Sequence, residues 1–293
     1  MKQTVEGKVL GKQIAYPQTY SPNILVAVPR SLNRDRYGID SAALPFCGQD
    51  VWHAYELSFL THKGLPVTGV LKLVYPTHSD FLVESKSLKL YLNSFNMERF
   101  GETPAKGLQI VLDTINKDLE QLLKISPKLG FFDHNSALLP YDFNGFELLE
   151  AADAINMLHF ESYTETPSLL KTGNTSETEL RVGTHLLRSN CKITFQPDWG
   201  SAFILMKGSK IPERSALLQY LVSIRNENHF HEEICEMIYK RLWDLFSPDQ
   251  LMVTCIYTRR GGIDICPARA SQPGLLPQNL INPNQLSLKL LRQ

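Results

Sequence analysis

The two halves of this chain repeat one predicted order of elements, and this repeat restricts the fold more than any other feature. In the N-terminal half, an alternating apolar run at residues 67–74 precedes a strand that contains Glu84 and a helix that begins after Thr103. In the C-terminal half, a strand that begins at Cys191 and a second strand at residues 202–206 precede further helices. The repeated order predicts an internal duplication.

A short similarity in sequence supports the duplication. Residues 91–95 and then 100–102 read Y-L-N-S-F and F-G-E, whereas residues 220–224 and then 230–232 read Y-L-V-S-I and F-H-E. A gap of a single residue aligns the two pairs of segments. We therefore predict two modules, at residues 1–145 and 146–293, with the connection between them in the region 144–179.

The predicted fold class is α+β, with antiparallel sheets and helices packed on one face. The helices should bury one apolar face each, and the last two predicted strands, 251–257 and 263–265, should form a hairpin around residues 259–262. No G-x-G-x-x-G segment follows a predicted strand, which argues against a dinucleotide-binding Rossmann domain. The residues predicted to face inward are Leu112, Ile115, Leu119 and Leu122 in the first helix, Leu217, Leu218 and Leu221 in the second, and Ile234, Met237, Ile238, Leu242 and Leu245 in the third.

Composition excludes several functional classes. The chain has 293 residues, a formal net charge of zero and 43% hydrophobic residues, enough for one or two domains with a buried core. The balanced charge gives no case for direct nucleic-acid binding. No apolar run is long enough to span a bilayer, and residues 1–6 show no signal-peptide pattern. The five cysteines form no C-x-x-C pair, so we predict a reducing, cytoplasmic location and no metal site.

Residues 84–91, E-S-K-S-L-K-L-Y, combine one carboxylate, two hydroxyls and two ammonium groups. As an extended strand, this segment would place Glu84, Lys86, Leu88 and Leu90 on one face. Such a strand would anchor a donor-rich heterocycle beside a phosphate. The alternative is an exposed edge strand protected by lysines.

A second group of residues lies about a hundred residues later. Cys191 is a candidate nucleophile, Asp198 a candidate acid in a predicted turn at residues 197–200, and His231-Glu232 a candidate proton and hydrogen-bond pair. Each has a simpler interpretation when taken alone. A single cysteine is commonly a small buried hydrophobe, and an aspartate commonly forms a turn.

These motifs together resemble the NADPH-dependent 7-cyano-7-deazaguanine reductases, the nitrile reductases of queuosine biosynthesis, in their two-module form. The resemblance covers nearly the whole chain in the expected order, and it implies tandem tunnelling-fold modules. The matching segments are V-P-R-S-L-N-R at 28–34, E-S-K-S-L-K-L-Y at 84–91, S-N-C at 189–191, Q-P-D-W-G-S at 196–201, F-H-E at 230–232 and Y-T-R-R-G-G at 257–262.

The resemblance also implies the reaction. A thiolate of Cys191 would add to the nitrile of 7-cyano-7-deazaguanine and form a covalent thioimidate, with Asp198 as acid and base. Two equivalents of NADPH would complete the four-electron reduction to the amine, with His231 as proton donor. Because the N-terminal half keeps the 84–91 signature and the C-terminal half keeps the cysteine, a site must draw on both kinds of half, which suggests a homodimer.

Binding roles follow from the same resemblance. Glu232 would accept hydrogen bonds from the donor edge of the deazaguanine ring, because a carboxylate matches two neighbouring donors. The arginine-glycine turn would hold the phosphates of the cofactor. The substrate contacts are assigned to Val83, Glu84, Ser85, His231 and Glu232, and the cofactor contacts to Ser85, Lys86, Lys89, Arg259, Arg260 and Gly261.

Three other functions are weighed against the reductase. A related amidinotransferase would use the same cysteine adduct but add ammonia, and the intact Lys86 and Lys89 favour reduction over it. A non-catalytic purine- or pterin-binding module would have no need of Cys191. A zinc cyclohydrolase of related fold is disfavoured by the shortage of metal ligands.

Overall fold

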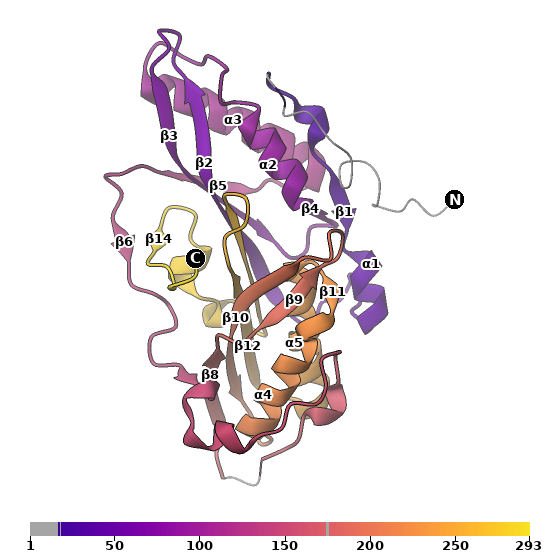
Figure 1. Cartoon of the computed structure of the whole chain (residues 1–293). Helices are drawn as coiled ribbons and strands as arrows, with labels where there is room; N and C mark the ends of the chain where they lie inside the picture. The colour runs from indigo at the N-terminus through magenta and orange to yellow at the C-terminus, as the bar shows by residue number, and fades with distance from the viewer. Residues whose placement is uncertain (1–16, 18, 174–175) are drawn as a thin grey trace.

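The computed structural model describes residue 17 and residues 19–173 and 176–293, and Figure 1 shows their arrangement. Residues 1–6, on which the signal-peptide prediction rests, lie outside the described part of the chain. Within the described ranges, no helix combines the length and the apolar character needed to cross a bilayer.

The structure mixes short and long strands with six α-helices among the described residues. The strands are β1 (Ala27–Pro29), β2 (Cys47–Leu60), β3 (Pro66–Pro76), β4 (Phe81–Val83), β5 (Lys128–Phe132), β6 (Leu138–Leu139), β7 (Glu147–Leu148), β8 (Glu179–Thr184), β9 (Arg188–Cys191), β10 (Pro197–Lys207), β11 (Asn228–His229), β12 (Gln250–Tyr257), β13 (Ile263–Ala270) and β14 (Leu286–Ser287). The α-helices are α1 (Ser31–Arg34), α2 (Ser85–Asn93), α3 (Pro104–Leu123), α4 (Arg214–Ser223), α5 (His231–Phe246) and α6 (Gln278–Ile281). The 3-10 helices are η1 (Pro22–Ile24), η2 (Asp35–Tyr37), η3 (Leu149–Ala151), η4 (Asp153–Met157), η5 (Pro167–Leu169), η6 (Ile224–Asn226) and η7 (Pro273–Leu275).

One ten-stranded sheet runs through both halves of the chain, in the order β11-β9-β10-β12-β13-β2-β3-β5, with β8 beside β10 and β7 beside β8. The pairs β11–β9 and β7–β8 are parallel, and the other pairs are antiparallel. The central pair, β13 with β2, joins a strand of the C-terminal half to one of the N-terminal half, from Ile263 opposite Ala54 to Ala270 opposite Cys47. Residues far apart in sequence therefore share one continuous surface.

The four long helices cover one face of this sheet. Successive residues of a strand point to opposite faces, and β12 shows the division: Val253 and Cys255 pack in the core with α4 and α5, whereas Met252 and Ile256 pack on the other side with Phe143 and Leu280. Helices α2 and α3 close a second core over β2 and β3. In Figure 1, α2 and α3 lie beside β2 and β3, and α4 and α5 lie beside β10 and β12. The predicted α+β class with helices on one face is confirmed.

The prediction of a strand at residues 84–91 is wrong, because this segment forms α2. The Glu84 carboxylate accepts hydrogen bonds from the backbone N–H groups of Lys86 and Ser87, and thus caps the helix. Leu88, Tyr91 and Leu92 then recur at helical spacing and are buried in the core under α2. The alternation of polar and apolar residues resembled a strand, but the cap and the wider apolar spacing favour a helix.

The predicted turn at residues 197–200 is also wrong, because β10 begins at Pro197. The turn lies five residues earlier, where the N–H of Cys191 donates to the Gln196 carbonyl at 2.8 Å. Phe195 closes this turn with a φ of 56°, in the left-handed region that non-glycine residues rarely adopt. Asp198 therefore belongs to a strand, opposite Ser189 of β9.

The strand predicted to begin at Cys191 is wrong, because β9 ends at that residue. The remaining helix predictions and the last hairpin are largely confirmed. Helix α3 follows Thr103, whose hydroxyl accepts from Lys106 N–H, and α4 follows Glu213. In α3 the fully buried positions are Val111, Ile115, Leu119 and Leu123, while Leu112 and Leu122 are partly buried. In α5 the predicted inward residues are buried, except that Leu245 is 48% exposed. The strands β12 and β13 form the predicted hairpin.

The two halves also share local hydrogen bonds. The Ser94 hydroxyl donates to the Tyr91 carbonyl and accepts from the Ser21 N–H. The Ser223 hydroxyl likewise donates to the Tyr220 carbonyl and accepts from the Thr166 N–H. In addition, a glutamate carboxylate accepts a backbone N–H in each half, Glu98 from Tyr20 and Glu227 from Glu165. The ends of α2 and α4 are thus fixed in the same way.

Candidate active site

A cavity of about 210 Å³ opens where the N-terminal ends of α2 and α5 face the β12–β13 turn. It brings together every predicted site residue except Arg259. The predicted residues that line it are Val83, Glu84, Ser85, Lys86, Lys89, Cys191, Asp198, His231, Glu232, Arg260 and Gly261. The other lining residues are Val28, Trp52, Leu82, Thr194, His229, Phe230, Thr258, Ile263 and Ile265. The chain thus forms this cavity from both of its halves.

The α2 side of the cavity is held by the helix cap. Glu84 is buried, and its two carboxylate oxygens accept from Lys86 N–H at 3.0 Å and from Ser87 N–H at 2.7 Å. The Ser87 hydroxyl donates to the Glu84 carbonyl and accepts from the Val26 N–H. Because both carboxylate oxygens of Glu84 are bound by the helix itself, this side chain fixes the wall more than it offers a free acceptor.

On the α5 side, the carboxylate of Glu232 lacks the hydrogen bonds that Glu84 has. Glu232 is 3% exposed, and its Oε1 atom has no hydrogen-bond partner among the described residues. Burial, and next the charge of Asp50, raise the pKa of Glu232 to about 8. The following residue, Glu233, fixes the start of the helix, because its Oε2 accepts from the Phe230 N–H. Glu232 is therefore held rigidly with an unsatisfied acceptor.

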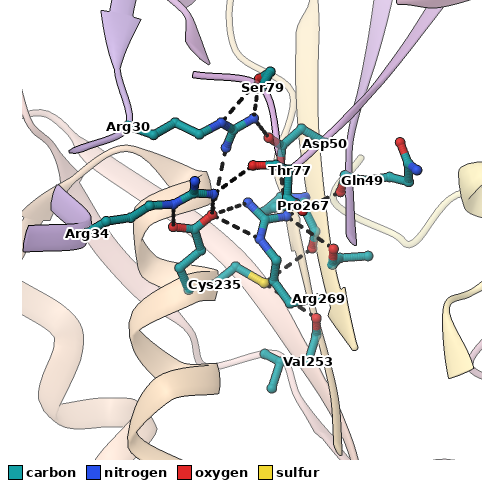
Figure 2. Close-up of polar contacts among 12 residues, drawn as sticks. Arg30, Arg34, Gln49, Asp50, Thr77, Ser79, Cys235, Val253, Pro267 and Arg269 are labelled. Carbon is teal, nitrogen blue, oxygen red and sulfur yellow. Dashed lines mark hydrogen bonds and ion pairs between the residues drawn. The ribbon is translucent and has the colours of Figure 1, made fainter. Parts of the chain in front are cut away.

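Behind Glu232 lies a cluster of five buried charges, which we call the inner charge cluster: Arg30, Arg34, Asp50, Glu236 and Arg269. Figure 2 shows the three arginines and Asp50 converging, with Thr77 and Ser79 beside them. Asp50 pairs with Arg30 at 2.5 Å and with Arg269 at 2.8 Å, and Glu236 pairs with Arg34 at 2.8 Å and with Arg269 at 3.0 Å.

The inner charge cluster contains more positive than negative side chains. Burial would raise the pKa values of Asp50 and Glu236, but the arginines lower both below their ordinary range. Both carboxylates are therefore ionised, and three arginines face two negative charges. Arg30 and Arg269 of the cluster lower the pKa of Glu232 in part, but burial and the charge of Asp50 outweigh them. The cluster also links both halves, since Arg30 and Asp50 come from the first and Glu236 and Arg269 from the second.

Cys191 lies at the end of β9 and is half-buried at the cavity. Its N–H donates to Gln196 and its carbonyl accepts from Phe195, so the tight turn fixes its backbone at both groups. The residue is positioned by the strand and the turn, with its side chain on the wall that also carries Asp198. This is a suitable place for a nucleophile, because a positioned thiol needs a neighbouring base and access to the ligand.

Asp198 is buried between two donors. Its Oδ1 forms an ion pair with Arg260 Nη1, and its Oδ2 lies 3.4 Å from His231 Nε2. His231 stacks on the ring of Tyr257 at 3.8 Å between ring centres. Burial lowers the pKa of His231 to about 3, so its imidazole is neutral at pH 7. A neutral imidazole is a hydrogen-bond donor and a weak acid, and its predicted role as proton donor stays a prediction.

The turn between β12 and β13 closes the cavity. Gly261 and Gly262 have φ values of 59° and 78°, which glycine adopts without strain. A Cβ atom on Gly261 would meet Lys89 Nζ at 3.0 Å, so the lysine lies directly against the turn. Lys89 and Arg260 therefore lie beside the Gly261 backbone, and Lys86 lines the same cavity. These residues fit the phosphates of a nicotinamide cofactor.

Arg259 differs from its neighbour Arg260. Its guanidinium carbon lies 3.4 Å from the centre of the Tyr55 ring, outside the set of residues that line the cavity. The predicted contact between Arg259 and the cofactor has no geometric support here.

Sequence reasoning did not find several residues that shape the site. Gln196 accepts from Arg260 Nη2 at 2.6 Å, and the Tyr257 ring stacks on His231. Both residues lie in the matched segments at 196–201 and 257–262, but the segments themselves do not indicate these contacts. Asp50, Glu236 and Arg269 of the inner charge cluster carried no signal, because their partners are distant in sequence.

One group of potential metal ligands occurs among the described residues, on the other face of the sheet. The ligand atoms of His53, Asp264 and Cys266 lie within 4.8 Å of one another. Lys289 already supplies a cation there, at 3.0 Å from His53 Nδ1 and 3.3 Å from Asp264 Oδ2. The prediction that the chain holds no metal stays a prediction.

Comparison with known proteins places this site in a family. Residues 16–128 match the family described as "Nitrile reductase, 7-cyano-7-deazaguanine-reductase N-term", and residues 197–273 match "QueF-like protein". A solved structure of an archaeosine synthase, QueF-Like in the apo form, is 17% identical, covers 33% of this chain and 98% of its own, and has a TM-score of 0.31, a likeness too weak to support a shared fold.

Relatives in sequence are much closer. A protein named NADPH-dependent 7-cyano-7-deazaguanine reductase from Chromohalobacter salexigens is 43% identical over 275 residues, which are 94% of this chain and 95% of the relative. Proteins of the same name from Coxiella burnetii and Delftia acidovorans are 40% and 39% identical, over 94% and 96% of this chain and 95% and 99% of the relatives. This chain belongs to the family of NADPH-dependent 7-cyano-7-deazaguanine reductases.

Proposed function

We propose that this chain reduces the nitrile of 7-cyano-7-deazaguanine to the primary amine of 7-aminomethyl-7-deazaguanine, with NADPH, in queuosine biosynthesis. The observation that carries the proposal is the convergence of Cys191 and Asp198 with the unpartnered Glu232 in one cavity. Thiol, acid and acceptor are the three groups that a covalent reaction on a donor-rich heterocyclic nitrile requires.

The covalent step uses groups on the C-terminal side of the cavity. The sulfur of Cys191 forms a bond to the nitrile carbon, and one π bond of the nitrile opens toward nitrogen. Asp198 takes the thiol proton and passes it to that nitrogen, which leaves a neutral thioimidate and a regenerated carboxylate. Asp198 suits this exchange because it is buried beside the neutral His231, at 3.4 Å.

Ring recognition falls to Glu232. An ionised carboxylate accepts two hydrogen bonds from neighbouring N–H donors of the ring, and such bonds are stronger than those between neutral groups. The unpartnered Oε1 atom and the positive surplus of the inner charge cluster both support this role. Val83, at the end of β4, and Ser85, at the start of α2, line the same cavity, and we assign the remaining substrate contacts to them.

When bound, NADPH supplies the hydride equivalents of the reduction, two in total for a nitrile. Lys86, Lys89, Arg260 and the Gly261 backbone would hold its phosphates, with Ser85 beside them. Lys89 already lies against Gly261, so a cation and an open backbone are adjacent.

We further propose that the two halves are tandem tunnelling-fold modules, at residues 1–145 and 146–293, and that the protein is a cytoplasmic homodimer. The matching hydrogen bonds at the ends of α2 and α4 support the duplication. The sheet ends at β5, an edge of the kind through which sheets associate. The five free cysteines are consistent with a reducing compartment. Sedimentation of the purified protein tests the dimer.

The decisive experiment follows NADPH oxidation at about 340 nm with 7-cyano-7-deazaguanine as substrate. We expect two NADPH consumed for each nitrile, and a covalent protein adduct by intact mass when NADPH is withheld. An adduct without NADPH oxidation, together with ammonia incorporation, would instead identify the amidinotransferase. Reversible binding with no adduct would identify a binding module.

A further inference from the structure

Arg260 serves two parts of the site at once. It belongs to the turn with Gly261 that suits the phosphates of NADPH, but its guanidinium group contacts Asp198 and Gln196. Nη1 pairs with Asp198 Oδ1, and Nη2 donates to Gln196 Oε1 at 2.6 Å. The side chain is 37% exposed, so it lies at the rim of the cavity and has room to change its partner.

The two roles compete for the same donors. Nη1 is bound to Asp198 and Nη2 to Gln196, so a phosphate that takes both terminal N–H groups in the strong bidentate geometry must displace these partners. Asp198 then loses its ion-pair partner. Lys86 and Lys89 of α2, His231 of α5 and Cys191 of β9 line the same cavity, and Asp198 Oδ1 is paired with Arg260.

We propose that Arg260 is shared between Asp198 and the phosphates of NADPH, so that cofactor binding loosens the Asp198–Arg260 ion pair. This inference rests on the proposed function and extends it. Without cofactor, Arg260 Nη1 is held in the ion pair with the Asp198 carboxylate. With cofactor, the phosphates compete for that donor and release the carboxylate that exchanges the proton between Cys191 and the nitrile nitrogen. One arginine thus links the cofactor site to the acid–base group.

Energetic coupling of this kind must be reciprocal. If cofactor binding weakens the ion pair, then the ion pair must weaken cofactor binding. Removing the charge of Asp198 should therefore tighten NADPH binding, although Asp198 is assigned to the substrate nitrogen and not to the cofactor. A merely structural role of the pair predicts no such gain.

The test measures NADPH affinity from its fluorescence, in the absence of nitrile, for the full-length protein. The substitution Asp198→Asn keeps the size of the side chain and removes its charge. We expect it to tighten NADPH binding roughly 5- to 150-fold, the usual range for coupled sites. Arg260→Met should weaken binding, and adding Asp198→Asn to it should then change nothing, because the shared partner is gone.

Arg259 provides a matched control, since it is the neighbouring arginine but stacks on Tyr55. In an Arg259→Met background, Asp198→Asn should give the same gain as in the wild type. Gln196→Ala removes the second hydrogen bond of Arg260 at an exposed position, and it should produce a smaller gain in the same direction. This variant tests the inference even if Arg260→Met fails to fold.

The outcomes separate the inference from the function. If the wild type binds NADPH but neither Asp198→Asn nor Gln196→Ala tightens it, the sharing of Arg260 is refuted and the reductase proposal stands. The sharing is equally refuted if Asp198→Asn gives the same gain without Arg260, because the effect is then a general charge effect. If the wild type binds no NADPH at all, the proposed function fails first.

Discussion

Two helices direct a buried glutamate toward the same cavity, and the two glutamates are in opposite states. Glu84 precedes α2 and Glu232 lies in the first turn of α5, and each is 3% exposed. Both oxygens of Glu84 accept backbone N–H groups of their own helix. Glu232 keeps Oε1 without a partner among the described residues. Burial and residue type are equal, and hydrogen bonding alone distinguishes them.

The contrast extends to the two sides of the cavity. On the α2 side, the carboxylate is used to build the wall, and the lysines beside it provide charge. On the α5 side, Glu232 Oε1 and His231 Nδ1 have no hydrogen-bond partner among the described residues, and Asp198 and Cys191 line the same cavity. A buried acceptor without a hydrogen-bond partner therefore indicates a ligand contact, since such an acceptor is unfavourable in free energy unless a ligand donates to it. The comparison supports our proposal that the chemistry lies on the C-terminal half.

The largest effect should come from the nucleophile. Cys191→Ala should lower turnover by on the order of 10⁴–10⁶-fold, because the covalent route is lost, and should abolish the adduct in intact-mass measurements. Cys191→Ser should be nearly as inactive, since an alkoxide forms much less readily than a thiolate.

Cys47, the other half-buried cysteine, supplies the control for this loss. Cys47→Ala should keep both turnover and adduct. Turnover that survives in Cys191→Ala, with circular dichroism unchanged, would move the chemistry away from the C-terminal side.

The next effect concerns Asp198. Asp198→Asn should slow adduct formation by about 10²–10⁴-fold, the usual contribution of a positioned proton transfer. Substrate affinity should change little, because the carboxylate is assigned to the nitrogen and not to the ring. Stopped-flow absorbance measures the first quantity, and calorimetry on the Cys191→Ala background measures the second. A loss of affinity at unchanged adduct rate would exchange the roles of Asp198 and Glu232.

Much of this arrangement follows from local sequence patterns. The apolar spacing of α5 and the position of Thr103 before α3 locate those helices correctly, because periodicity and caps are local signals. Residues 84–91 fit two patterns, because their polar and apolar residues alternate as in a strand and also match the spacing of a helix. The hydrogen bonds from the Glu84 carboxylate to the backbone of residues 86 and 87 favour the helix. Asp198 was likewise assigned to a turn because P-D-W-G is a typical turn sequence.

The contacts that distinguish the two sides of the cavity are not local. Arg260 and Asp198 are 62 residues apart, and Arg34 and Glu236 are 202 residues apart. Sequence spacing does not predict ion pairs between such distant residues. The motif at residues 257–262 indicates a phosphate as the partner of Arg260, whereas the structure pairs Arg260 with a carboxylate. The family motifs identify which residues meet in the cavity, whereas the state of each residue depends on these distant partners.

A third effect compares the two glutamates directly. Glu232→Gln should weaken binding of 7-cyano-7-deazaguanine by roughly 5- to 150-fold, since it leaves a buried mismatch of about 1–3 kcal/mol with the ring donors. Glu84→Gln should leave affinity nearly unchanged. Calorimetry on the Cys191→Ala background measures both. Equal losses in the two variants would remove the distinction between wall and ligand carboxylate.

The pH dependence sharpens the same contrast. The pKa of Glu232 is raised to about 8 in the free protein, and the ring donors require the ionised form. Affinity should therefore rise with pH and level off above about 8, by at most about tenfold per pH unit. Binding at pH 6.5 should release a proton, which calorimetry detects in buffers of different ionisation enthalpy. In Glu232→Gln this dependence should disappear.

The smallest effects concern stability alone, and the two glutamates should differ in sign. Glu84→Gln weakens the cap of α2 and should cost about 0.5–2 kcal/mol at neutral pH. For Glu232 the folded pKa is raised above the ordinary value of 4.5. Its contribution to stability is thus fully present below pH 4.5 and is lost as the pH rises through 8. Glu232→Gln should therefore match the wild type near pH 4.5 and exceed it at pH 8, by up to about 1.4 kcal/mol per pH unit between. Urea unfolding at the two pH values measures both variants.

A Glu232→Gln protein that is less stable than the wild type at pH 8 would contradict this prediction. It would show that the inner charge cluster stabilises the ionised carboxylate before any ligand binds. The contrast between the two glutamates would then lie in geometry alone.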